Sequence, residues 1–180
     1  MKKNQKGFSL IELLIVVAII LIIAAIAIPN LLRAKIAANQ SAAVGTLRTI
    51  SSAEETYSST YSDGFTPTLA ALGGAPGALA VCNTNAELID EVLGQDPATK
   101  GGYQYNYLNN GVPALVTGIP AACGGASGFT GFSVSAGPLS LSTGTSAYCI
   151  DETGVVRVDS GATALENLNP CSASGKSPLQ

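Results

Sequence analysis

The chain has 180 residues, enough for one modest domain beside a long helix. Its nine basic and twelve acidic residues give a net charge of −3, and an acidic surface argues against general nucleic-acid binding. The sequence contains no histidine, which rules out Ser-His-Asp and Cys-His catalytic arrangements. Nucleotide-binding and hydrolase motifs are also missing, so we expect neither an enzyme nor a bound cofactor.

The N-terminal segment joins a basic leader, residues 1–7, to an apolar run over residues 8–28. As a helix this run spans about 31 Å, enough to cross a bilayer core of roughly 30 Å. Glu12 is the only ionisable side chain in the run, and a carboxylate there costs on the order of 3 kcal/mol. A plain membrane anchor explains the length and the lysines of the leader, but it explains neither Glu12 nor the glycine that ends the leader.

Residues 29–58 continue the helix as an amphipathic half, so one long helix is predicted over residues 8 to about 59. Its apolar residues recur at helical spacing, and we expect this stripe to pack on a globular head: Leu32, Ile36, Val44, Leu47 and Ile50. Pro29 lacks a backbone donor and predicts a kink or local melting. Gly45 is a second weak point in the helix.

The N-terminal residues resemble the processing motif of type IV pilins and of type II secretion pseudopilins. The match consists of Gly7-Phe8-Ser9-Leu10-Ile11-Glu12, the apolar run and Ile28-Pro29-Asn30. The resemblance implies that a dedicated peptidase cleaves between Gly7 and Phe8 and methylates the new amino terminus. It favours melting at Pro29 in an assembled filament, whereas the alternative is that Pro29 only marks the membrane boundary.

Glu12 is the candidate assembly residue. Its carboxylate is predicted to neutralise the amino terminus of Phe8 in a neighbouring subunit, because such a pair is strong in a low-dielectric core and each partner is costly alone. The pair would fix the axial register between subunits. The alternative is a carboxyl group that stays neutral without a partner.

Residues 59–180 are predicted to form the head. A connecting loop over residues 59–81 contains a short turn at residues 69–72, and residues 83–93 are predicted to form a short helix. Strands are expected where apolar or aromatic residues alternate with polar ones, separated by turns at residues 109–111 and 151–154: residues 102–108, 129–136, 147–150 and 155–158. The tail from residue 167 is expected to be irregular. The fold class is α+β, a long N-terminal helix on a three- or four-stranded antiparallel sheet, as in type IV pilin-like proteins.

The four cysteines, Cys82, Cys123, Cys149 and Cys171, form no Cys-x-x-Cys pair. Zinc binding is therefore not expected, and two disulfides are predicted for an exported domain. Sequence allows three connectivities, of which we favour Cys82–Cys123 with Cys149–Cys171. The second disulfide would fasten the C-terminal tail to a strand.

Aromatic and acidic residues complete the candidates. The tyrosines at 103, 105 and 107 alternate along one strand, and Tyr57, Tyr61 and Phe65 are expected in the core between helix and sheet. Asp151, Glu152 and Asp159 flank the second turn and have oxygen ligands suited to calcium. A solvated turn is the favoured interpretation there, and no metal site is predicted.

The resemblance implies a structural subunit of a type IV pilus. A pseudopilin of a type II secretion system is the first alternative, and a membrane-anchored binding domain is the second. The implied partners are other copies of the chain, the membrane, a prepilin peptidase, an assembly platform, an assembly ATPase and minor pilins. The implied location is the inner membrane with the head in the periplasm, and then a surface pilus or a periplasmic pseudopilus.

Overall fold

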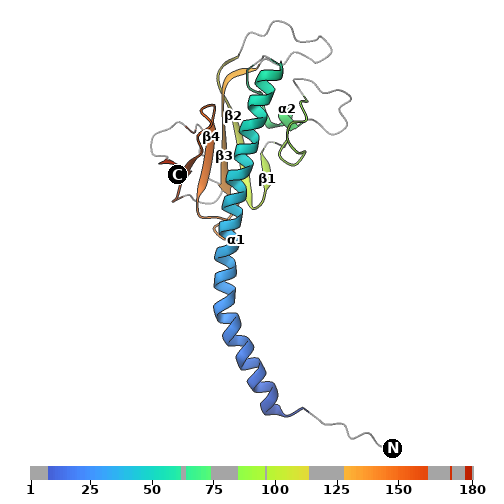
Figure 1. The fold of residues 1–180 in the computed structure, drawn as a ribbon, viewed down its shortest axis with the longest axis vertical. Helices are drawn as coiled ribbons and strands as arrows, with labels where there is room; N and C mark the ends of the chain where they lie inside the picture. Colours follow the sequence, from blue (N-terminus) through green and yellow to red (C-terminus); the bar gives the residue numbers. More distant parts are fainter. Residues whose placement is uncertain are drawn as a thin grey trace, which may run out of the picture. The chain divides into compact units, whose positions relative to one another are not determined.

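The structure, a computed structural model, describes residues 8–61, 64–73, 85–95, 97–113, 128–161, 171 and 177–179. The chain divides into two units, residues 1–35 and 36–180. The helix α1 (Leu10–Tyr61) contributes to both units and continues through Pro29 and Gly45 (Figure 1). The predicted long helix is therefore confirmed, and it is not melted at Pro29 in this structure. A kink at Pro29 and melting there in an assembled filament stay predictions.

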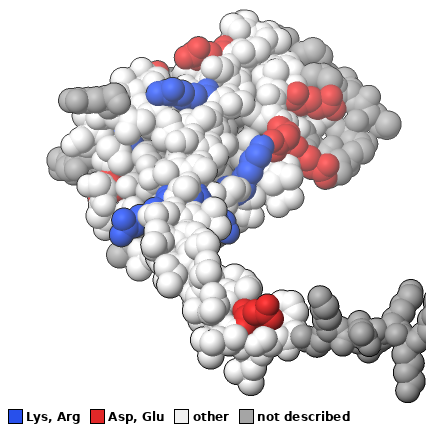
Figure 2. All heavy atoms as spheres, turned by 60° about the horizontal axis from the view of Figure 1, so that its bottom comes forward, with Lys and Arg blue, Asp and Glu red and all other residues white. Residues whose placement is uncertain are grey.

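In the N-terminal unit, α1 exposes apolar side chains all around its circumference. The exposed fractions of its large apolar side chains run from 80% at Leu10 to 46% at Val17. An 18-residue window has a mean hydropathy of 3.3, so α1 is long and apolar enough to cross a membrane. Glu12 is the only charged residue between Phe8 and Leu32, and the surface in Figure 2 is correspondingly uncharged apart from one acidic group. Such a helix needs lipid or other chains around it.

In the C-terminal unit, the remainder of α1 is an amphipathic helix that lies along one face of a sheet (Figure 1). Its buried positions lie on one helix face, as expected from helical spacing: Ala43, Leu47, Ile50, Ser51, Ala53, Glu54 and Tyr57. A polar contact supports this packing, because Asn39 Nδ2 donates a hydrogen bond of 3.0 Å to the carbonyl of Thr143. The expected packing of an apolar stripe on the head is confirmed at Val44, Leu47 and Ile50. It is wrong at Leu32, which belongs to the N-terminal unit and is 48% exposed.

Among the described residues, the sheet has six antiparallel strands, and each strand pairs with the next one along the chain. The strands are β1 (Ala98–Lys100), β2 (Tyr103–Pro113), β3 (Phe129–Pro138), β4 (Ala147–Asp151), β5 (Arg157–Asp159) and β6 (Ser177–Pro178). The prediction of three or four strands is therefore too low. The first and last have only three and two residues, too few for alternation to be visible, and β6 lies in the tail that was expected to be irregular.

Alternation along the strands divides their residues between two faces. Tyr103 and Tyr105 are buried and share one core with Phe132 and the stripe of α1, which confirms the predicted tyrosine face. Tyr57, Tyr61 and Phe65 also belong to or pack against this core, as predicted. The ring centroids of Phe65 and Phe132 are 4.8 Å apart.

The opposite face of β3 and β4 is buried as well. Ala147, Cys149 and Cys171 form a separate buried cluster, and Ser133 and Ser135 are fully buried. The backbone N–H of Cys171 donates a 3.0 Å hydrogen bond to Ser133 Oγ. The C-terminal segment at Cys171 thus covers part of the face opposite α1.

The prediction of a short helix over residues 83–93 is wrong for the part that the structure describes, which begins at Asn85. The backbone N–H groups of Ala86 and Leu88 donate 2.9 Å hydrogen bonds to carbonyls of α2 (Leu69–Gly73). Because a neighbouring element binds these donors, residues 85–90 form no helix, and a turn follows at residues 91–94. The turn expected at residues 69–72 is confirmed as α2.

The two predicted strand turns have different outcomes. The prediction of a turn at residues 109–111 is wrong. Asn109 and Asn110 instead continue strand β2 and pair with Phe132 and Gly131 of β3. The turn at residues 151–154 is confirmed, since the Gly154 N–H donates a 2.9 Å hydrogen bond to the Asp151 carbonyl. Gly154 has φ +71°, a left-handed conformation that favours glycine.

Candidate processing and assembly site

The first turn of α1 is closed by two residues of the N-terminal motif. The Ser9 carbonyl accepts a 3.3 Å hydrogen bond from the Leu13 N–H. The Glu12 carboxylate accepts a 3.0 Å hydrogen bond from the Ser9 backbone N–H. The N–H groups at a helix start have no intrahelical acceptor, and the helix dipole favours negative charge there. Glu12 therefore caps its own helix.

Sequence reasoning identified Glu12 but missed Ser9. The pattern Ser-x-x-Glu at residues 9–12 is the signature of a capping box, which was visible in the sequence. Phe8, immediately before, is 79% exposed. Gly7 lies outside the described residues, so cleavage after Gly7 and the register role of Glu12 both stay predictions.

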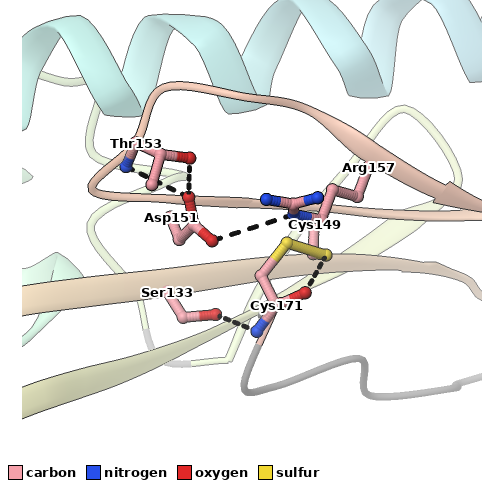
Figure 3. Close-up of polar contacts among 6 residues, drawn as sticks. All are labelled: Ser133, Cys149, Asp151, Thr153, Arg157 and Cys171. Carbon is pink, nitrogen blue, oxygen red and sulfur yellow. Dashed lines mark hydrogen bonds and ion pairs between the residues drawn. A yellow bond between two sulfur atoms is a disulfide. The ribbon is translucent and has the colours of Figure 1, made fainter. Parts of the chain in front are cut away.

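The second candidate region holds the Cys149–Cys171 disulfide, shown in Figure 3, whose Cα atoms are 5.5 Å apart. This half of the predicted connectivity is confirmed. Cys149 belongs to β4, and the disulfide joins this strand to Cys171, which is buried in the same cluster. The predicted pair Cys82–Cys123 lies outside the described residues.

Asp151 is buried beside this disulfide, in contrast to the solvated turn that was expected. Its Oδ1 atom accepts hydrogen bonds from the backbone N–H and the hydroxyl of Thr153 (Figure 3). Its Oδ2 atom is 3.9 Å from Arg157 Nε. The carboxylate of Asp151 therefore holds the β4–β5 turn. Within the described part of the chain, no three His, Cys, Asp or Glu side chains are grouped to hold a metal ion.

Glu54 is a buried carboxylate that sequence reasoning did not single out as a site. Its side chain is 0% exposed, and it accepts hydrogen bonds from the backbone N–H of Thr66 (2.9 Å) and from the Thr66 hydroxyl (2.5 Å). The Tyr107 hydroxyl is a third donor, at 2.9 Å. Burial raises the pKa of Glu54, although these hydrogen bonds act in the opposite direction. An acidic residue at helical spacing among apolar ones, Ile50, Glu54 and Tyr57, was the available signal.

Comparison with known proteins supports the interpretation of the N-terminus. Residues 2–28 match the family model described as the prokaryotic N-terminal methylation motif. This match confirms the predicted resemblance of the N-terminal residues to the type IV pilin processing motif, and the long apolar helix followed by an antiparallel sheet agrees with the predicted fold class.

Two curated relatives are type IV pilus proteins. The type IV wide pilus major component PilA4 of Thermus thermophilus is 51% identical over 55 residues, which cover 31% of this chain and 42% of that protein. The type IV major pilin protein PilA of Myxococcus xanthus is 46% identical over 72 residues, covering 36% of this chain and 33% of that protein. The similarity thus spans less than half of either relative. No solved structure matches this chain significantly.

Proposed function

We propose that this chain is a structural subunit of a type IV pilus that assembles through its N-terminal helix. The observation that carries this proposal is the N-terminal part of α1, which is apolar and exposed around its circumference and carries a single carboxylate at its start. In water such a surface is unstable, whereas in a bilayer or a bundle of identical helices it is buried. The names of both relatives describe major pilus components and agree with this role.

The proposed sequence of events begins in the membrane. The helix spans the inner membrane with the head in the periplasm, and a prepilin peptidase removes residues 1–7 and methylates Phe8. Glu12 then neutralises the amino terminus of a neighbouring subunit while the helices pack into the filament core. An assembly platform, an ATPase and minor pilins supply the remaining steps, since a nucleotide-binding motif is missing from the sequence.

The proposal is tested by shearing surface filaments from the native host and measuring the intact mass and N-terminal peptide of the filament protein. Abundant protein that begins at a singly methylated Phe8 in the sheared fraction supports a pilus subunit. The same processed protein found only in the cell envelope would instead indicate a pseudopilin or a minor pilin. A chain that keeps residues 1–7 in all fractions would contradict the proposal.

A further inference from the structure

Glu54 joins three parts of the head. It belongs to α1, its hydrogen-bond donor Thr66 belongs to the connection that follows α1, and Tyr107 belongs to β2. The Tyr107 hydroxyl is also 2.8 Å from the Thr66 carbonyl oxygen and 3.2 Å from the Thr66 hydroxyl. These distances close a buried hydrogen-bonded ring between helix, connection and sheet.

The ring can satisfy its polar atoms in two protonation states. When Glu54 is ionised, the Tyr107 hydroxyl donates to Glu54 Oε1, and Thr66 supplies the other two donors. When Glu54 is protonated, its carboxyl O–H donates to the Tyr107 oxygen. The Tyr107 hydroxyl then turns to the carbonyl of Thr66, which lies 2.8 Å away. Neither state leaves a donor of the ring without an acceptor, so a buried unsatisfied group does not oppose the exchange.

The surroundings of the carboxylate favour uptake of a proton. Hydrogen bonds from Thr66 and Tyr107 favour the charged form of Glu54. Burial disfavours the charged form, and its effect on the pKa is the largest. The titratable groups that act on the ring are the phenols of Tyr107 on β2 and Tyr57 on α1. The described segment 64–68, α2 and β3 carry no ionisable side chain, and the acids of segment 85–95 are exposed. None of these described elements places a positive charge beside the Glu54 carboxylate.

We propose that Glu54 is a buried proton-binding site of the head, and that acidification reverses its hydrogen bond with Tyr107 and stabilises the junction of α1, the connection and β2. The pKa of Glu54 in the folded head is above that of a carboxyl group in the unfolded chain. At a pH between the unfolded and the folded pKa of Glu54, folding is therefore coupled to the uptake of a proton. The resulting stabilisation of the folded head is lost as pH rises through the folded pKa. This property is independent of whether the chain forms pili.

The test compares thermal unfolding of the full processed chain in detergent micelles across acidic to neutral pH. Near-UV circular dichroism of the buried tyrosines reports the head, because the sequence has no tryptophan. Wild-type protein is expected to melt at a higher temperature as pH falls toward the ordinary carboxyl range of about 4.3. Glu54→Gln is expected to lose this dependence. Glu55→Gln, which changes the neighbouring exposed carboxylate, is the matched control and is expected to keep it.

A second measurement follows the proton itself, and it also decides the outcome if Glu54→Gln does not fold. Infrared difference spectra of Glu12→Gln protein with isotope-labelled glutamate, in which the other carboxyl group of an apolar environment is removed, should show one protonated carboxyl group at a pH where exposed glutamates are ionised. In Tyr107→Phe, which lacks the phenolic donor, this group should be protonated at still higher pH. Equal pH dependence of melting in wild type and Glu54→Gln, or Glu12→Gln spectra in which all remaining glutamates titrate in the ordinary range, would overturn the proposal.

Discussion

The Glu12 carboxylate accepts a 3.0 Å hydrogen bond from the backbone N–H of Ser9, so this charged group has a partner within its own chain. An ionised carboxylate has two oxygens and about four acceptor positions. The bond uses one position of Oε2 and leaves others for the amino terminus of a neighbouring Phe8. Capping of α1 and pairing between subunits are therefore compatible, and substitutions at residue 12 can separate them.

The first prediction distinguishes these two roles of Glu12. Both Glu12→Ala and Glu12→Gln should insert into the membrane, because each removes a charge from the apolar helix. Gln can still accept the Ser9 N–H bond of the capping box, but it cannot neutralise an ammonium group. We expect both variants to lose filaments, measured as pilin in the sheared fraction relative to the membrane fraction. Normal filaments from either variant would contradict the register role, and normal filaments from Glu12→Gln alone would show that capping is sufficient.

The second prediction concerns processing at Gly7. A glycine before Phe8 permits close approach of a peptidase to the backbone, so Gly7→Leu should trap the precursor with its leader in the membrane. The intact mass of the membrane-extracted protein measures this result directly. Ser9→Ala is the control, because it keeps the backbone N–H that Glu12 binds and leaves Gly7 unchanged. A product of normal mature mass from Gly7→Leu would refute the assignment of the cleavage site.

The third prediction concerns the disulfide between β4 and the C-terminal segment. Replacing both Cys149 and Cys171 by serine releases a cross-link across 22 positions, which should lower the free energy of unfolding of the head by about 3 kcal/mol. Denaturant unfolding of the processed protein in detergent measures this difference. Lys100→Ala is the comparison, since it removes an exposed ion pair with Asp90, and it should cost less than about 1 kcal/mol. Similar losses in both variants would contradict a structural role for this disulfide.

The sequence predicted the parts of the fold that local pattern determines. The long apolar helix, the alternating tyrosines of β2 and the turn ending at Gly154 each rely on contacts or conformations that recur along neighbouring residues. The errors occur where a distant element supplies the hydrogen-bond partners. Residues 85–90 form no helix because the N–H groups of Ala86 and Leu88 bind carbonyls of α2. Strand β2 continues past Asn110 because β3 is long enough to pair with it.

The candidate residues show the same division. Glu12 was evident because a charge within an apolar run is costly wherever the chain folds. Asp151 was interpreted as solvated because its sequence neighbours form a turn, whereas Arg157 and the surrounding strands bury it. Glu54 depends on Thr66 and Tyr107, which are 12 and 53 positions away, and no local pattern predicts that they meet.

The last prediction compares two glycines for which an added Cβ meets no atom within 4 Å. Gly45 lies in α1, where alanine is favoured by about 1 kcal/mol, so Gly45→Ala should raise the stability of the head. Gly154 has φ +71°, a conformation that costs an L-residue roughly 1–2 kcal/mol, so Gly154→Ala should lower the stability. Asn tolerates this conformation better than Ala, and Gly154→Asn should lose less. Since neither site is sterically restricted, melting-temperature shifts of the same sign for the two alanine variants would show that backbone conformation does not determine their effect.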